Sequence, residues 1–238
     1  MSVEPNSIAT TEDFEFAALS EAVNYRAAIV DEFAPYLRGR VLEVGAGIGQ
    51  TTEAMMALPE VDELVGVEPD TRFQNGFRQR LPEVRLVAGT TADLNPGETF
   101  DAAVMVNVLE HIEHDVQELR RLREILSERS GHLCILVPAR QELYSRLDAH
   151  FGHFRRYDRP GLKAVLLQAG FEIESLFYFN VIGYFAWGLR YTLLRGMSFD
   201  VQQVRVFDRK IFPVAHRLER GLVRPPFGQS LVAIARAK

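Results

Sequence analysis

The sequence predicts an α/β fold with a doubly wound sheet of seven strands, mostly parallel, in which the last strand is antiparallel. Short apolar segments rich in β-branched residues recur along the chain, and segments with apolar residues at helical spacing separate them. A glycine-rich turn also follows the first apolar segment and opens a helix. Strands that alternate with helices of this length form a parallel sheet with helices on both faces.

The expected strands lie at regular intervals. They cover residues 41–45, 64–68, 84–88, 101–107, 132–137, 171–177 and 230–235. Between the second and third strands, Phe73, Phe77 and Leu81 recur at helical spacing. Before the sixth strand, Asp158 has the position of a helix N-cap and Gly170 that of the glycine that ends the helix.

The length of 238 residues fits a single domain over 1–238 that begins with an N-terminal helical cap over 1–38. Residues 181–227 depart from the strand–helix alternation. This segment carries a charge of +5, whereas the rest of the chain sums to −10, and its first part is strongly apolar. We expect an insert or lid that docks an anionic or lipid-linked acceptor. Membrane contact through 181–195 and a dimer interface are the alternatives.

Composition restricts the class of protein. Hydrophobic residues make up 47% and charged residues 25% of the chain, as in soluble globular proteins. The single cysteine, Cys134, lies in an apolar run, which fits a reducing compartment. With no signal peptide or membrane span in the sequence, we expect a cytoplasmic protein, with peripheral contact at the inner face of the membrane left open. The net charge of −5 and the lack of an RNA-binding motif argue against a nucleic-acid substrate.

The glycine-rich turn indicates a nucleoside-containing cofactor. Gly45, Gly47 and Gly49 follow the first strand, and Glu68 ends the second, where its carboxylate can accept bonds from two ribose hydroxyls. A dinucleotide fingerprint needs a small residue at the position that Gln50 occupies, and its third glycine would come one residue later. The spacing therefore favours a different nucleoside cofactor.

The pattern Glu43-x-Gly45-x-Gly47-x-Gly49 resembles motif I of the class I S-adenosyl-L-methionine (SAM)-dependent methyltransferases, which have a Rossmann-like fold. The resemblance implies SAM as the cofactor. It places Glu43 near the methionine ammonium, the backbone of Gly45 and Gly47 along the methionine and ribose, and Glu68 with Pro69 at the ribose hydroxyls.

Two further loops belong to the same resemblance. Methyltransferases commonly carry Gly-Asp-Ala after the third strand, with the aspartate on the adenine amino group. Here Thr90 replaces the aspartate. The Thr90 hydroxyl or the backbone at Thr91 would substitute, or Asp93 would fold back. After the fourth strand, Asn107 and Val108 open a loop that resembles motif IV, which borders the transferring methyl.

The same loop contains Glu110 and His111. Some metal-assisted methyltransferases carry Glu-x-x-Glu-His here and bind a divalent ion with a further histidine. Asn107 stands in place of the first glutamate, and a neutral amide is a poorer ligand for a hard cation. We therefore expect no metal. His111 is a candidate catalytic residue by position, although bracing of the following helix is the simpler role.

A polar, aromatic loop follows the fifth strand, at the edge where an acceptor must sit. Residues 150–157 include His153 as a candidate general base, and Arg155 and Arg156 as candidates to hold an anion. This loop, together with 178–180, 207–209 and 225–231, resembles bacterial methyltransferases linked to surface-glycan or glycolipid biosynthesis.

The expected function is methyl transfer from SAM to a small-molecule, glycan or lipid-linked acceptor, with O-methylation preferred. One alternative is a C- or N-methyltransferase of a quinone-like ring or another small metabolite. Another is a catalytically silent SAM-binding regulatory or scaffold subunit, which Thr90 favours but Glu43, the glycines and Glu68 oppose. The acceptor and the oligomeric state stay open at this stage.

Overall fold

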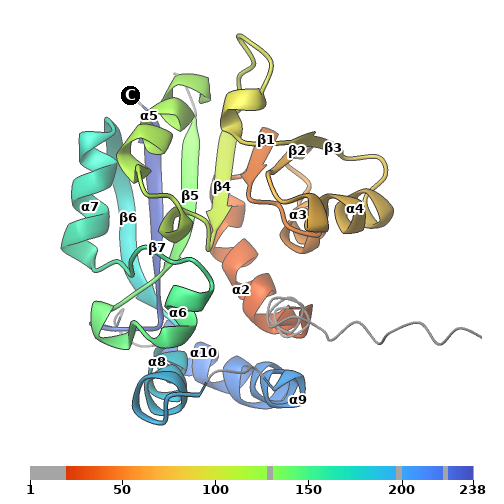
Figure 1. Cartoon of the computed structure of the whole chain (residues 1–238). Helices are drawn as coiled ribbons and strands as arrows, with labels where there is room; N and C mark the ends of the chain where they lie inside the picture. Colours follow the sequence, from red (N-terminus) through yellow and green to blue (C-terminus); the bar gives the residue numbers. More distant parts are fainter. Residues whose placement is uncertain (1–19, 128–130, 197–199, 222–224, 238) are drawn as a thin grey trace, which may run out of the picture.

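The computed structural model describes residues 20–127, 131–196, 200–221 and 225–237. Its centre is a seven-stranded sheet in the order β3-β2-β1-β4-β5-β7-β6, with helices on both faces (Figure 1). The strands are β1 (Gly39–Val44), β2 (Val61–Glu68), β3 (Arg85–Ala88), β4 (Ala102–Val106), β5 (His132–Pro138), β6 (Phe171–Phe179) and β7 (Ser230–Ala237). Only β7 runs antiparallel to its neighbours within this sheet, β5 and β6. The predicted fold class is therefore confirmed.

The helices that precede or connect the strands are α2 (Val23–Phe33), α3 (Gln50–Met55), α4 (Thr71–Arg80), α5 (Asp115–Ile125), α6 (Arg146–His150) and α7 (Arg159–Gln168). Among them, α3, α4 and α7 lie where the sequence predicts helices, whereas α6 was not predicted. Short 3₁₀ turns are η1 (Ala34–Tyr36), η2 (Thr91–Asp93), η3 (Leu109–His111) and η4 (Gln141–Leu143). Of the expected N-terminal cap over 1–38, α2 and η1 are described, and residues 1–19 lie outside the described residues.

The core has two halves, one on each face of the sheet. In β5, Leu133 and Ile135 face the cluster that packs against α5 and α7, whereas Cys134 and Leu136 face the cluster that contains α2. Successive side chains of a strand point to opposite faces, so a strand covered on both faces must be apolar throughout. Burial raises the pKa of the Cys134 thiol, which makes it an inert core residue.

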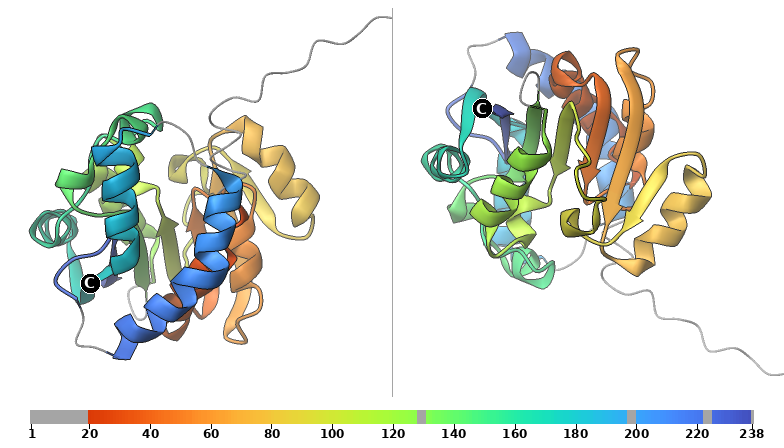
Figure 2. Two further views of the ribbon diagram at one scale, coloured as in Figure 1. Left: turned by 90° about the horizontal axis from the view of Figure 1, so that it is seen from below. Right: turned by 90° about the horizontal axis from the view of Figure 1, so that it is seen from above.

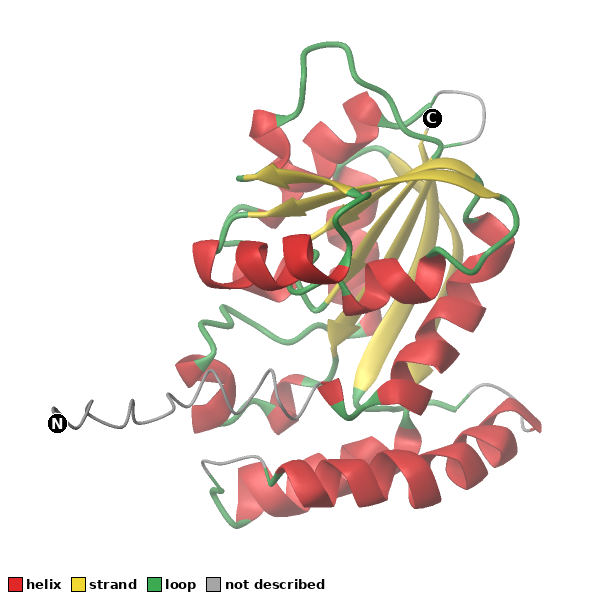
Figure 3. Ribbon diagram, turned by 90° about the vertical axis from the view of Figure 1, so that its right-hand side faces the viewer, coloured by secondary structure: helices red, strands yellow, loops and turns green. Residues whose placement is uncertain are grey.

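Residues 181–221 form helices between β6 and β7. These are α8 (Val181–Trp187), the π-helical turn η5 (Gly188–Leu193), α9 (Val201–Val206), the π-helical turn η6 (Phe207–Ile211) and α10 (Phe212–Gly221). They form a layer below the carboxyl ends of the parallel strands in Figure 1, and Figure 3 shows the same layer from the side. The insert therefore lies on the edge of the sheet that carries the glycine loop.

A buried carboxylate joins the insert to α2. Asp208 accepts hydrogen bonds from the backbone N–H of Asn24 (2.9 Å) and Tyr25 (2.8 Å) and from the Asn24 side chain (3.1 Å). The N-cap position of α2 is Ala22, which has no side chain able to cap, so Asp208 does this from another part of the chain. A helix cap contributes about 1 kcal/mol, and a buried charged acceptor contributes more. The insert and α2 thus form one packed unit.

A second set of polar contacts closes the base of the insert. The Asn180 side chain accepts from the Gly183 N–H (2.9 Å) and donates to Gln229 Oε1 (2.8 Å). Glu219 of α10 accepts from the backbone N–H of Asn180 (3.0 Å) and Val181 (3.1 Å). The segments around 178–180 and 225–231 that the sequence singled out therefore fix the two ends of the insert.

Candidate functional site

The glycine loop follows β1 and packs against Val108, in the loop that follows β4. The N–H groups of Gly45 and Ala46 both donate to the Val67 carbonyl of β2, at 2.8 and 3.0 Å. Gly45 has φ of +71°, and a Cβ there would lie 2.5 Å from Val108 Cγ2. Glycine is required here by the protein's own packing. Val108, which the sequence places beside the cofactor, is thus in contact with the glycine loop.

Gly47 is the position where the loop leaves room. Its φ is +55°, and a Cβ built on it would meet nothing within 4 Å. Gly49 differs, because a Cβ there would lie 2.8 Å from Leu81 Cδ1, so it serves the packing of α3 against α4. Of the three glycines, Gly47 is the one that borders open space. It is the point where a ligand can lie against the backbone.

Glu68 lies directly beside Gly47. The Gly47 N–H donates to Glu68 Oε2 and the Asp70 N–H to Glu68 Oε1, both at 2.8 Å. Burial raises the pKa of Glu68, although these two bonds oppose the shift. A carboxylate oxygen has lone pairs for more than one donor, so both oxygens can still accept a ribose hydroxyl. The neighbouring Pro69 is exposed.

Glu43 is the second buried acid of this site. It is only 2% exposed, and the Thr52 hydroxyl donates to its Oε2. Burial, with a contribution from the nearby Glu68, raises the pKa of Glu43 to about 8, although the Thr52 hydrogen bond and the charge of Arg26 oppose the shift. A cationic group placed near these acids would favour their ionised forms. The pair therefore suits a ligand that carries positive charge, as SAM does.

The loop after β3 forms a closed turn. The Asp93 carboxylate accepts from the N–H (2.8 Å) and the hydroxyl (3.1 Å) of Thr90. Thr91 is buried, and its hydroxyl donates to Glu118 of α5 at 2.6 Å. Asp93 folds back onto Thr90, so its carboxylate and the Thr90 hydroxyl bond each other, and which group contacts the adenine stays a prediction. The side chain of Thr91 is directed to α5.

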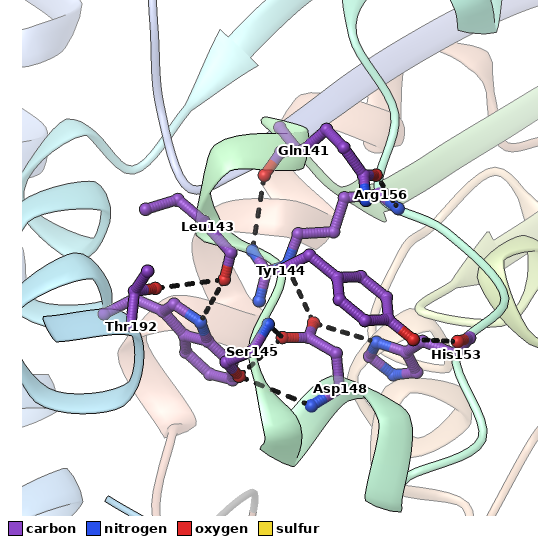
Figure 4. Close-up of polar contacts among 10 residues, drawn as sticks. Gln141, Leu143, Tyr144, Ser145, Asp148, His153, Arg156 and Thr192 are labelled. Carbon is purple, nitrogen blue, oxygen red and sulfur yellow. Dashed lines mark hydrogen bonds and ion pairs between the residues drawn. The ribbon is translucent and has the colours of Figure 1, made fainter. Parts of the chain in front are cut away.

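The candidate acceptor side centres on a buried carboxylate that the sequence analysis did not single out. Asp148 of α6 accepts from the backbone and hydroxyl of Ser145, from Arg156 Nε at 2.7 Å, and lies 3.1 Å from His153 Nδ1 (Figure 4). Burial alone would raise the pKa of Asp148, but the bond from His153 and the charge of Arg156 outweigh it and lower the pKa to about 2. The carboxylate is therefore ionised and fixes both partners.

Asp148 orients the His153 ring. With the ring proton on Nδ1, facing the carboxylate, Nε2 carries the free lone pair. The ring packs edge-on against His111, with 4.6 Å between centroids, and the loop is joined to η3 by the bond from the Phe154 N–H to the Glu110 carbonyl (2.9 Å). His153 and the motif IV loop are thus brought together, as the sequence predicts. Desolvation, with His153 adding to it, lowers the pKa of His111 to about 4, so His111 is a weak base.

The two arginines of this loop are held by protein carboxylates. Arg155 donates to Asp115 of α5 at 2.7 Å and to the Glu113 carbonyl at 2.9 Å. Arg156 is buried, bonds Asp148, and lies over the Trp187 ring of α8 at 4.6 Å from the ring centroid. The expectation that Arg156 faces an acceptor anion is wrong in this structure, because Asp148 already neutralises its charge. Arg155 is 31% exposed, and its role in acceptor binding stays a prediction.

The turn η4, which precedes α6, also contacts the insert. The Leu143 carbonyl accepts from Trp187 Nε1 and from the Thr192 hydroxyl, both at 3.2 Å (Figure 4). One sequence signal could have pointed to Asp148. Ser145 and Asp148 have the spacing of a capping box, and the structure shows both of its bonds. A surface hollow along α7 and β6 lies away from these site residues.

We expect Glu68→Ala to weaken SAM binding by about 1.5–3 kcal/mol, roughly tenfold or more, because it removes acceptors for two hydroxyls. Isothermal titration calorimetry would measure this. Glu63→Ala is the matched control, since Glu63 lies on the same strand with an exposed side chain, and it should bind SAM normally. Unchanged affinity in Glu68→Ala, or tight binding of NADH by the wild type, would contradict the assignment.

We expect Glu43→Gln to flatten the pH dependence of stability in the absence of SAM. Between pH 4.5, the ordinary pKa, and about 8, the folded protein binds one proton more than the unfolded chain at Glu43. The free energy of unfolding therefore falls as pH rises through this window, by up to about 1.4 kcal/mol per pH unit. Urea unfolding across the window would reveal it. Parallel profiles for the wild type and Glu43→Gln would show that Glu43 is not responsible.

Comparison with known proteins places this chain in a family. The sequence model of a methyltransferase domain matches residues 16–176. A search of curated proteins found no match. A SAM-dependent methyltransferase from Archaeoglobus fulgidus is 20% identical, with a TM-score of 0.59, and 90% of this chain and 93% of that chain are covered.

Two other solved structures share the fold. One is a methyltransferase in complex with the Haloferax volcanii Trm112 methyltransferase activator, 14% identical, with a TM-score of 0.64 and 99% of both chains covered. The other is Haemonchus contortus phosphoethanolamine N-methyltransferase 2 with SAM bound, 15% identical, with a TM-score of 0.65, covering 97% of this chain and 58% of that chain. Since the domain model spans more than half of the sequence, the chain belongs to the methyltransferase-domain family.

Proposed function

We propose that this methyltransferase transfers the methyl group of SAM to a hydroxyl of a glycan or lipid-linked acceptor, with His153 as the general base. The observation that supports this most directly is the Asp148–His153 pair beside the motif IV loop. In the reaction, the acceptor oxygen forms a bond to the methyl carbon as the bond between that carbon and sulfur breaks. The hydroxyl proton passes to His153 Nε2, and Asp148 stabilises the imidazolium that results.

The assignment of the base to His153 rather than His111 follows from their surroundings. A base must be able to hold a proton near neutral pH, and a pKa of about 4 makes His111 unsuitable. His111 instead packs against His153 and limits the positions that its ring can take. The sulfonium is already an electrophile, so the remaining tasks are in-line positioning and exclusion of water.

The acceptor class is supported by the basic, apolar insert at the same edge and by the resemblance to glycan and glycolipid methyltransferases.

Among the described residues, the structure has no helix long and apolar enough to cross a bilayer. Peripheral contact of an otherwise cytoplasmic protein with the inner face of the membrane, through 181–195, is part of this proposal. A C- or N-methyltransferase of a quinone-like or other small metabolite is the runner-up, and phosphoethanolamine N-methyltransferase among the structural neighbours supports that alternative.

The test is incubation of the protein with deuteromethyl-SAM and separate polar and lipid extracts, followed by mass spectrometry. A labelled methyl ether in a glycan or lipid-linked product supports the proposal. A label on carbon or nitrogen of a small metabolite would favour the runner-up. SAM binding without any labelled product would favour a catalytically silent SAM-binding subunit.

We expect His153→Ala to lower kcat by about 10²–10⁴-fold, the usual contribution of a general base. SAM affinity should stay close to that of the wild type, because His153 lies on the acceptor side. His150→Ala is the matched control, since His150 ends α6 only three residues before His153 and is exposed, and it should retain activity. Near-normal turnover in His153→Ala would leave the loop with a structural role only.

We expect turnover to survive EDTA, because Asn107 replaces a carboxylate of the metal-binding pattern. The structure makes this measurement decisive, since ligand atoms of Glu110, His111 and His153 lie within 4.8 Å of one another. Two imidazoles and a carboxylate are donors that divalent transition metals accept. Activity that is lost in EDTA and restored by manganese or zinc would make His153 a metal ligand instead of the base.

A further inference from the structure

The exposed apolar side chains of this protein gather on the insert. Twelve large hydrophobic residues are exposed among the described residues, and eight of them lie within 181–221. These are Phe185, Leu189, Leu193, Leu194, Val206, Ile211, Val214 and Leu218. Leu193 and Leu194 reach 72% and 67% exposure. Single exposed apolar residues are ordinary on a protein surface. A group of them within one segment of the chain indicates an interaction surface.

On each helix these residues form a stripe. In α8 and η5, Phe185, Leu189 and Leu193 are spaced four residues apart, which keeps them on one face. In α9 to α10, the π-helical turn η6 separates Val206 from Ile211, and its i to i+5 geometry brings the two onto nearly the same face. The three- and four-residue steps to Val214 and Leu218 continue that stripe.

The stripes face away from the rest of the protein. On the other side of α8 and η5, Trp187 and Thr192 bond the Leu143 carbonyl. On the other side of η6 and α10, Asp208 and Phe212 are buried against α2. The view from below in Figure 2 shows both helices in front of the sheet. Together they present an apolar layer at the edge that carries the glycine loop and His153.

The positive charge of this segment indicates which kind of partner the apolar layer would bind. Lys210 and Arg217 are exposed on the same helix as Ile211, Val214 and Leu218. Over 181–227 the net charge is +5, in a chain whose remaining residues sum to −10. Two copies packed through this face would bring like charges together, whereas an anionic lipid surface is complementary to it. A helix with an apolar face and flanking cations is the form that binds in the plane of a bilayer interface.

We propose that residues 181–221 are a docking surface for an anionic lipid bilayer, which holds the carboxyl edge of the sheet against the membrane. This inference rests on the proposed function and deepens it, because it places the acceptor in the headgroup region of the bilayer. The two apolar stripes enter the interface, and Lys210, Arg217 and Arg195 contact lipid phosphates. The protein lies on the membrane without crossing it.

The test is co-sedimentation of the full chain with vesicles of equimolar phosphatidylcholine and phosphatidylglycerol, and with phosphatidylcholine alone. We expect binding to the anionic vesicles, weakened by salt. Leu193→Asp and Leu218→Asp should each reduce it about tenfold or more, since an apolar side chain leaves the bilayer. Lys210→Glu should reduce it about fivefold or more. The matched controls are Leu167→Asp and Lys163→Glu, which change exposed residues of α7 outside the insert and should bind as the wild type.

Absence of binding to anionic vesicles, or equal losses in the α7 controls, would overturn the proposal. So would a wild-type dimer, seen by analytical ultracentrifugation, that Leu193→Asp dissociates while no vesicle binding occurs, because the partner would then be a second copy. Calorimetry of SAM with each variant keeps the two proposals separate. SAM binding and product formation without vesicle binding would leave the proposal of methyl transfer intact and remove only its membrane contact. Vesicle binding without any product would support the docking surface and contradict the proposal of methyl transfer.

Discussion

The candidate acceptor side of this protein depends on the hydrogen bonds and ion pairs of one ionised carboxylate, that of Asp148. It is fully buried and bonds Ser145, Arg156 and His153, which come from α6 and from the loop that follows it. Through Arg156, which lies over Trp187, it also connects the loop to the insert. A buried ion pair is costly to form, and loss of one partner leaves the other charge uncompensated. The arrangement therefore fixes one position of His153, which suits a base that must meet its substrate in a single geometry.

The cofactor side follows a different electrostatic rule. Glu43 and Glu68 are both buried, and each has a raised pKa because desolvation disfavours the charged form. Glu43 and Glu68 accept hydrogen bonds from the Thr52 hydroxyl and from backbone N–H groups. The charge of Arg26 lowers the pKa of Glu43, but burial outweighs it. A cationic ligand would add to this compensation. The candidate SAM site thus suits a positive charge, whereas the buried carboxylate on the candidate acceptor side already has charged partners.

The insert contacts elements of both sides and has an exposed apolar outer face. Asp208 bonds it to α2, Glu219 and Asn180 close its base, and Trp187 donates to the Leu143 carbonyl of η4 and lies against Arg156 of the candidate acceptor loop. All these polar anchors lie on its inner side, while its apolar residues are exposed on the outer side. A soluble protein gains nothing in stability from such an outer face. A surface that works against a lipid interface would have this distribution of side chains.

Local patterns in the sequence were sufficient for the strands, for most of the helices, and for the glycine loop with Glu68. Period-two and helical spacing, turn glycines and strand ends are properties of neighbouring residues, and a parallel sheet necessarily brings its carboxyl ends to one edge. The tertiary structure alone decided that Asp208 caps α2, that Asp148 holds His153 and Arg156, and that Arg155 pairs with Asp115. Asp208 bonds residues more than 180 positions away, and local periodicity carries no information on such partners. Even Asp148, only five residues from His153, becomes its partner because the chain between them folds back in three dimensions.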